Sequence, residues 1–142
     1  MIRRLMLTTV IAILPLAVTA ALPRTAIAGD ARRDAILADY AAKAGTASFS
    51  AQRGETLFRT KSTGGDPRTS SCTACHTSDP RQPGQNAKTG RPIEPVAVSV
   101  NPRRFTDPAT VEKQFTRDCR SVLGRDCTPL EKGDYITFLA GQ

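Results

Sequence analysis

Large apolar side chains are scarce in this sequence of 142 residues, which has no tryptophan and only 5 % aromatic residues. A small domain of this composition buries a modest core, and such domains usually depend on a disulfide, a metal or a cofactor for their stability. Alternating strand patterns, internal repeats and low-complexity tracts are missing as well. We therefore predict a small all-α domain with long loops and without strand pairs.

The one long apolar run, residues 5–21, is shorter than the roughly 20 residues that a membrane-spanning helix needs, and Pro15 interrupts it. It follows a charged start at Arg3 and Arg4, and the sequence Ala-Ile-Ala comes soon after it at residues 26–28. A charged start, a short apolar segment and a small-residue cleavage site are typical of a secretory signal peptide. A retained membrane anchor is the weaker alternative.

We expect the signal peptide to comprise residues 1–28 and the mature domain to comprise residues 29–142, with cleavage after Ala20 as the main alternative. Export would place the domain in the periplasm, with no stable membrane insertion after cleavage. Because the leader holds three arginines and no acidic residue, its removal lowers the formal net charge from +7 to +4. A mildly basic, exported domain favours an acidic protein surface over nucleic acid as a partner.

The four cysteines fall into two unlike pairs. Cys72 and Cys75 belong to a Cys-x-x-Cys-His motif that ends in His76, the only histidine of the chain. Cys119 and Cys127 lie farther along, with no histidine beside them. Because exported thiols oxidise, we expect Cys119 and Cys127 to form a disulfide that closes a short loop.

The Cys-x-x-Cys-His spacing is typical of a covalently attached haem. Two thiols three residues apart can add to the two vinyl groups of one porphyrin, and the histidine that follows them then lies at the iron. We therefore predict one haem c that is attached through Cys72 and Cys75, with His76 as the proximal iron ligand. A buried haem would also supply apolar volume that the sequence lacks.

Three other interpretations of the cysteines have less support. A zinc site built from all four would have an unusual ligand spacing and would need exported thiols to stay reduced. A thioredoxin-like redox motif would need a βαβ pattern around it, and none is present. A plain disulfide between Cys72 and Cys75 would leave His76 without a role.

Apolar periodicity and capping residues predict four helices. The expected spans are 30–44, 50–60, 107–122 and 128 to the end of the chain. Gly54 lies inside the second span, where glycine costs helix stability, so we expect a close helix crossing there. The Pro- and Gly-rich stretch 77–105 is long for a loop without structure, and wrapping a prosthetic group would explain its length.

The histidine and methionine content restricts the second axial position of the iron. Met1 and Met6 are the only methionines and both lie in the leader, so the mature domain can make neither His/Met nor bis-His coordination. The sixth position must then be open, filled by water or held by another side chain. Asp118 shares a predicted helix face with Val111 and Phe115, which makes it the leading candidate. The other candidates are Asn86, Asn101, Lys88, Lys113, Lys132, Tyr40 and Tyr135.

Several motifs together resemble the sphaeroides haem protein (SHP) family, a group of small exported monohaem cytochromes related to class I cytochromes c. The resemblance runs through most of the mature domain. Its most specific stretch is Ser-Val-Leu-Gly-Arg-Asp-Cys-Thr-Pro at 121–129, with Cys119 before it. The other matching segments are 54–58, 63–65, 71–76, 84–85, 89–90, 104–107 and 111–113.

This resemblance implies a small cytochrome c-like helical domain wrapped around one covalent haem, with a disulfide at Cys119 and Cys127. The family's hallmark is an asparagine as sixth iron ligand, directly before the first disulfide cysteine. That ligand leaves on reduction and opens the ferrous iron to oxygen or nitric oxide. The corresponding residue here is Asp118, which could bind ferric iron, hydrogen-bond a bound water or turn away.

The sequence thus predicts a periplasmic monohaem c-type cytochrome that transfers electrons and has a labile or open sixth iron site. The resemblance implies redox partners among multihaem c-type or membrane b-type cytochromes. The alternative function is an oxygen- or nitric oxide-binding haem protein, or a small-molecule reductase. An electron carrier or a gas-binding protein is favoured over an enzyme.

Overall fold

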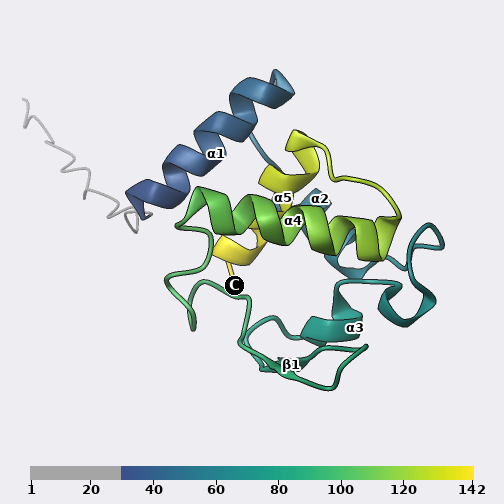
Figure 1. Ribbon diagram of the computed structural model, residues 1–142. Coiled ribbons are helices and arrows are strands. Elements are labelled where there is room, and N and C mark those ends of the chain that lie inside the picture. Colours follow the sequence, from purple (N-terminus) through teal and green to yellow (C-terminus); the bar gives the residue numbers. More distant parts are fainter. Residues whose placement is uncertain (1–29) are drawn as a thin grey trace, which may run out of the picture.

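Polar caps fix where the helices of this chain begin. The computed structural model describes residues 30–142 (Figure 1), and the expected signal peptide, residues 1–28, lies outside this part. At four helix starts, a side-chain oxygen accepts a hydrogen bond from a backbone N–H of the first turn, which satisfies a donor that the helix itself cannot pair. These capping residues are Asp30, Ser50, Asp107 and Thr128, which are the first residues of the four predicted spans.

The elements in chain order are α1 (Ala31–Ala44), α2 (Ala51–Arg59), a short 3-10 turn (Pro67–Thr69), α3 (Thr73–His76), β1 (Gly84–Gln85), β2 (Pro92–Ile93), α4 (Pro108–Leu123) and α5 (Pro129–Ala140). The predominance of helix confirms the predicted all-α class. None of the helices within residues 30–142 is both long and apolar enough to cross a membrane.

The centre of the fold is the crossing of α2 over α5, as Gly54 predicts. A Cβ atom on Gly54 would overlap the backbone carbonyl of Asp134, so only glycine lets the two helices approach this closely. The Phe58 ring, which is fully buried, packs against Phe138 at a centroid distance of 5.6 Å. The buried Asp134 carboxylate accepts hydrogen bonds from the backbone N–H of Ser50 and from the guanidinium of Arg53, which stabilises the crossing.

Helix α1 packs against α5 with a face that differs from the predicted one. Its buried residues are Arg33, Ile36 and Tyr40, whereas the i, i+3, i+4, i+7 spacing of Leu37, Tyr40, Ala41 and Ala44 predicts those four as the inner face. The difference arises because Arg33 is 94 % buried and donates to carbonyl oxygens of the segment before α4. An arginine was thus buried where the pattern expected it to face solvent.

The long segment between α3 and α4 carries one feature that the sequence analysis predicted wrongly. Strand pairs were expected to be missing, but Gly84 pairs with Ile93 and Gln85 with Pro92 in a two-stranded antiparallel ladder. The ladder is too short to leave an alternating pattern in the sequence. The following segment is fixed to the core, because Val96 is buried and its N–H donates to the carbonyl of Pro80.

Candidate haem site

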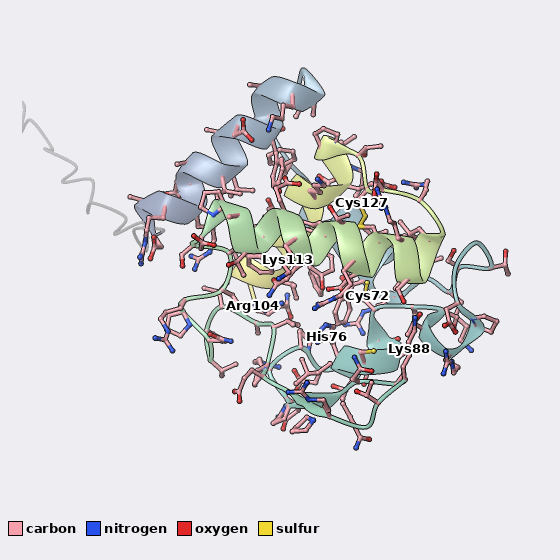
Figure 2. The ribbon with its side chains drawn as sticks, viewed as in Figure 1. Cys72, His76, Lys88, Arg104, Lys113 and Cys127 are labelled. Atoms are coloured by element: carbon pink, nitrogen blue, oxygen red, sulfur yellow. A yellow bond between two sulfur atoms is a disulfide. The ribbon has the colours of Figure 1, made fainter. Side chains whose placement is uncertain are left out.

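A cavity of about 920 Å³ lies between α4 and the segment that contains α3 and the β1–β2 hairpin. This volume is near the upper end of the range of about 300–1,000 Å³ that is typical of cofactor and ligand pockets. Figure 2 shows His76 and Cys72 pointing into the space below α4. A smaller void of about 40 Å³ extends the cavity toward the apolar core. The residues that line this void include Leu57, Phe105 and Phe115.

The residues of the Cys-x-x-Cys-His motif form one wall of this cavity. Cys72 is the N-cap of α3, a single helical turn that places Cys75 and His76 directly after it. The hydroxyl of Ser71, which is buried, lies 2.7 Å from that of Thr73 and so fixes the start of the turn. Both Cys72 and Cys75 are free thiols, so the interpretation of this pair as a plain disulfide is not supported.

The electrostatics of this wall suit metal coordination by a neutral imidazole. Burial, together with the positive charge of Arg104, lowers the pKa of His76 to about 4, so the ring is uncharged at neutral pH. Neutral imidazole is the form that binds metals. Its Nδ1 atom is buried and has no hydrogen-bond partner among residues 30–142. Burial, together with the nearby Asp118 carboxylate, raises the pKa of Cys72 to about 12, so this thiol stays protonated.

This arrangement fits a haem that is held by two thioether bonds and one imidazole. Two free thiols and a neutral histidine share the wall of a cavity that is large enough for a cofactor. The interpretation of the four cysteines as a zinc site is wrong, because Cys119 and Cys127 are bonded to each other. Within the described part of the chain, no group of three or more His, Cys, Asp or Glu side chains is placed to bind a metal.

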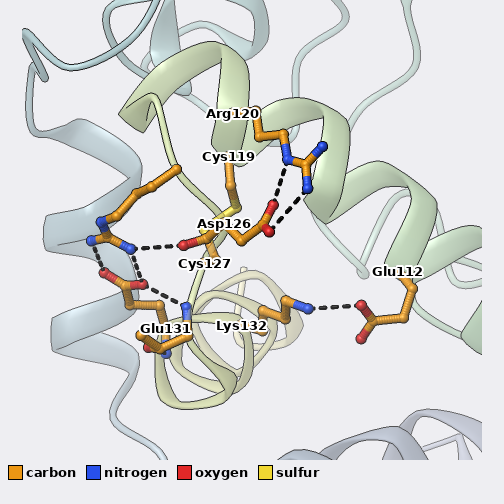
Figure 3. The surroundings of a disulfide bond; sticks show 9 residues. Glu112, Cys119, Arg120, Asp126, Cys127, Glu131 and Lys132 are labelled. Atoms are coloured by element: carbon orange, nitrogen blue, oxygen red, sulfur yellow. Dashed lines mark hydrogen bonds and ion pairs between the residues drawn. A yellow bond between two sulfur atoms is a disulfide. The ribbon is translucent and has the colours of Figure 1, made fainter.

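The disulfide between Cys119 and Cys127 connects α4 to the segment before α5, with a Cα–Cα distance of 5.6 Å. Two ion pairs surround it, Arg120 with Asp126 at 2.7 Å and Arg125 with Glu131 at 2.7 Å (Figure 3). In the chain-entropy model a loop of this length stabilises the fold by about 2.5 kcal/mol. The bond also fixes the end of α4 next to Asp118.

Asp118 lies at the edge of the inward face of α4 and lines both the cavity and its extension. The predicted neighbours on that face, Val111 and Phe115, are buried, whereas the Asp118 side chain is 48 % exposed. Its carboxylate accepts hydrogen bonds from the guanidinium of Arg117 at 2.6 and 3.0 Å. Asp118 is therefore near the cavity but is paired with its neighbour in the chain.

Only some of the other candidates for the sixth position line the cavity. Lys88, Asn86 and Tyr135 line the cavity. Lys88 forms an ion pair with Asp66 at 3.1 Å, and the Asn86 carbonyl oxygen accepts two backbone N–H groups of its own loop. The candidates that do not line the cavity are Lys113, Lys132, Tyr40 and Asn101.

Two cavity residues were missed as candidates for the sixth position by the sequence analysis. Gln114 lines the cavity and its extension, and its place one helical turn before Asp118 was a signal that could have revealed it. Arg104 also lines both spaces, and its Nε atom is buried without a partner among residues 30–142. The loop that carries Arg104 has no periodicity that would indicate this position.

Comparison with known proteins decides the family. A family described as a domain of unknown function (DUF1924) matches residues 44–139. The cytochrome c-type protein SHP of Cereibacter sphaeroides is 53 % identical over 89 residues, which span 63 % of this chain and 68 % of that protein. The chain belongs to the SHP family of c-type cytochromes. This family assignment agrees with the resemblance found in the sequence.

Solved structures agree with membership of the SHP family. The structure of oxidised SHP, an oxygen-binding cytochrome c, superposes with a TM-score of 0.74 at 49 % identity and covers 78 % of this chain and 96 % of SHP. Cytochrome c'' of Methylophilus methylotrophus is 41 % identical over 86 residues, which are 61 % of this chain and 60 % of that protein. Its solution structure, described with regard to haem-ligand detachment, has a TM-score of 0.64 at 32 % identity and covers 79 % of this chain and 94 % of cytochrome c''.

Proposed function

We propose that this member of the SHP family is a periplasmic monohaem c-type cytochrome that transfers electrons. Residues 29–142 would form the mature domain after removal of residues 1–28. One haem c would be attached through Cys72 and Cys75, with His76 as its proximal ligand. The observation that carries this proposal is the cavity wall on which two free thiols and a neutral imidazole, whose Nδ1 atom is buried, lie side by side.

The bound haem would supply a redox-active iron, and the protein would control access to its second axial position. Residues 30–142 contain no methionine and no second histidine, so a strong nitrogen or sulfur ligand of the usual kind is missing. Asp118 is the acidic residue of α4 that lines the cavity. A carboxylate is a hard anionic donor that favours ferric over ferrous iron. We propose that Asp118 is a weak distal ligand or a hydrogen-bond acceptor there, which leaves the sixth position labile or open.

A second candidate function is binding of oxygen or nitric oxide, or reduction of a small molecule. The Asp118 side chain is half exposed and paired with Arg117, so it does not close the cavity. The relatives of this chain support gas binding. SHP is an oxygen-binding cytochrome c, and the solution structure of cytochrome c'' is described with regard to haem-ligand detachment. An open iron site suits gas binding better than fast electron transfer.

The charge around the cavity favours an acidic redox partner. Its cationic lining residues are Lys88, Arg91, Arg104, Arg117 and Arg120, against the acidic Asp66 and Asp118. Complementary charge guides encounter and orientation between redox proteins. Multihaem c-type or membrane b-type cytochromes with an acidic face are therefore the proposed partners.

Ligand binding by the reduced protein tests for the labile or open sixth position that both functions share, against a carrier whose site is closed. If the chain is a carrier with a labile ligand or a gas-binding protein, its reduced form will bind carbon monoxide and change its Soret absorption. If a strong sixth ligand closes the site, the spectrum will not change. A pyridine haemochrome spectrum tests the haem itself, independently of the sixth ligand.

A further inference from the structure

Helix α4 forms the wall of the cavity that is opposite His76. The cavity lies between this helix and the segment that carries the Cys-x-x-Cys-His motif, and Figure 2 shows His76 in the space below α4. The two axial positions of a haem iron lie on opposite faces of the porphyrin. If His76 is the proximal ligand, the sixth position therefore faces α4, and the side chains that this helix contributes to the cavity decide which ligands are stable there.

The polar side chains that α4 contributes to the cavity wall are Gln114, Arg117, Asp118, Arg120 and Ser121. Arg117 and Asp118 are paired with each other. Arg120 is paired with Asp126 at 2.7 Å, outside the cavity. The hydroxyl of Ser121 lies 2.8 Å from that of Thr69. The side-chain amide of Gln114, in contrast, makes no hydrogen bond with any of the residues 30–142.

Gln114 also lies on the inward side of α4. It lines the smaller void that extends toward the apolar core, as Asp118 does, whereas Arg117 and Arg120 do not. The neighbouring Phe115 is buried, and Gln114 itself is half-buried. Because water competes less for hydrogen bonds in apolar surroundings, an amide at this place can stabilise a polar ligand more strongly than an exposed amide could.

Gln114 and Asp118 are one helical turn apart, so their side chains lie on the same face of α4. Their chemistry differs, because the carboxylate only accepts hydrogen bonds, whereas the amide has two N–H donors. A diatomic gas that draws electron density from a reduced iron becomes partly negative. A hydrogen-bond donor stabilises such a ligand and a carboxylate repels it. Gln114 and Asp118 should therefore act on gas binding in opposite directions.

We propose that the amide of Gln114 donates a hydrogen bond to a diatomic gas at the sixth position and so determines which gas this protein prefers. This inference rests on the proposed function, since it needs a haem in the cavity and a sixth position that is labile or open. Oxygen draws more electron density from a reduced iron than carbon monoxide does. The hydrogen bond from Gln114 therefore favours oxygen over carbon monoxide.

The test compares Gln114→Leu with Gln52→Leu in the haem-loaded protein. Gln52 is exposed on α2 and does not line the cavity, so Gln52→Leu removes the same amide where it cannot meet the gas. We expect Gln114→Leu to raise the dissociation rate of oxygen from the reduced protein roughly three- to tenfold, as the loss of one hydrogen bond predicts. The dissociation rate of carbon monoxide should rise by a smaller factor. An unchanged oxygen rate, or equal effects of the two variants, would overturn the proposal.

A second variant and a spectroscopic measurement separate hydrogen bonding from a change in packing. Gln114→Glu keeps nearly the same size but replaces the amide NH₂ group by an oxygen, so the donor is lost. A donor beside carbon monoxide lowers the C–O stretching frequency in the infrared spectrum. We expect this frequency to rise in both Gln114→Leu and Gln114→Glu and to stay unchanged in Gln52→Leu. A frequency in Gln114→Glu that is equal to that of the wild type would contradict the hydrogen bond.

Failure of the proposed function gives a different result from failure of this inference. Absence of covalent haem from the wild-type protein would refute the proposed function and the role of Gln114 together. A reduced wild-type protein that carries haem but does not bind carbon monoxide would refute the open sixth position, and the inference with it. Covalent haem and gas binding that Gln114→Leu leaves unchanged would refute only the role of Gln114.

Discussion

The guanidinium of Arg117 holds the carboxylate of Asp118 at the wall of the cavity, with N–O distances of 2.6 and 3.0 Å. Adjacent residues on a helix do not face each other, so Arg117 must fold back along α4 to reach its neighbour. Both residues line the cavity. In the proposed haem protein, this ion pair would compete with the iron for the Asp118 carboxylate.

We expect Asp118→Asn to raise the reduction potential, because it removes a negative charge next to the iron. Asp126→Asn removes the same charge from an exposed position that is paired with Arg120, and it serves as the matched control. Asp118→Ala should keep its covalent haem and change the rate of ligand binding. Redox titration measures the potentials, and a shift no larger than that of Asp126→Asn would contradict a position near the iron.

The reduced wild-type protein should bind carbon monoxide rapidly, because no methionine or second histidine is present in residues 30–142 to occupy the sixth position. The oxidised protein should be largely high-spin. Stopped-flow absorption of the reduced protein checks the first expectation. If the ferrous protein is low-spin and does not react, a strong ligand must be present, and Lys88 is the lysine that lines the cavity.

Most of the features that the sequence predicted correctly depend on short sequence motifs. The caps at Ser50 and Thr128, the glycine at the α2–α5 crossing and the Cys-x-x-Cys-His motif each depend on residues that are close in the chain, or on a steric requirement that only glycine meets. These features gave the helix starts, the all-α class and the family resemblance.

Long-range contacts explain what the sequence did not reveal. Arg33 is buried because the carbonyl oxygens of residues 102 and 104 accept hydrogen bonds from its guanidinium. The local sequence pattern of α1 cannot predict partners that lie about 70 residues away in the chain. The β1–β2 ladder is too short for an alternating pattern. The pairing of Asp118 with Arg117 depends on side-chain rotamers, so the sequence could place Asp118 near the cavity but could not give its partner.

The disulfide should leave no free thiol at Cys119 and Cys127 in the unfolded, unreduced mature protein. Replacing both by alanine should lower the free energy of unfolding by about 2–3 kcal/mol, since the denatured chain is then less restricted. Denaturant titration measures this loss. Two labelled thiols at these positions, or a double variant as stable as the wild type, would contradict the structural role of the bond.

Glu131 should make the stability of the fold depend on acid. Hydrogen bonding to Arg125 lowers its pKa from the ordinary value of 4.5 to about 2. A carboxyl whose pKa is lowered by folding stabilises the folded state above its ordinary pKa, and this contribution is lost as the pH falls from about 4.5 toward 2. The stability difference between the wild type and Glu131→Gln should therefore be present at pH 7 and vanish near pH 2. A difference independent of pH would refute the ion pair as its source.

The most direct test of the central claim is covalent haem on a denaturing gel of the exported protein, stained for peroxidase activity. We expect a haem band in the wild type and in the matched Cys119→Ala/Cys127→Ala variant, and none in Cys72→Ala/Cys75→Ala. His76→Ala should lose most of the folded, haem-loaded protein because the proximal ligand is gone. A haem band of normal intensity in Cys72→Ala/Cys75→Ala would contradict attachment of the haem through these two thiols.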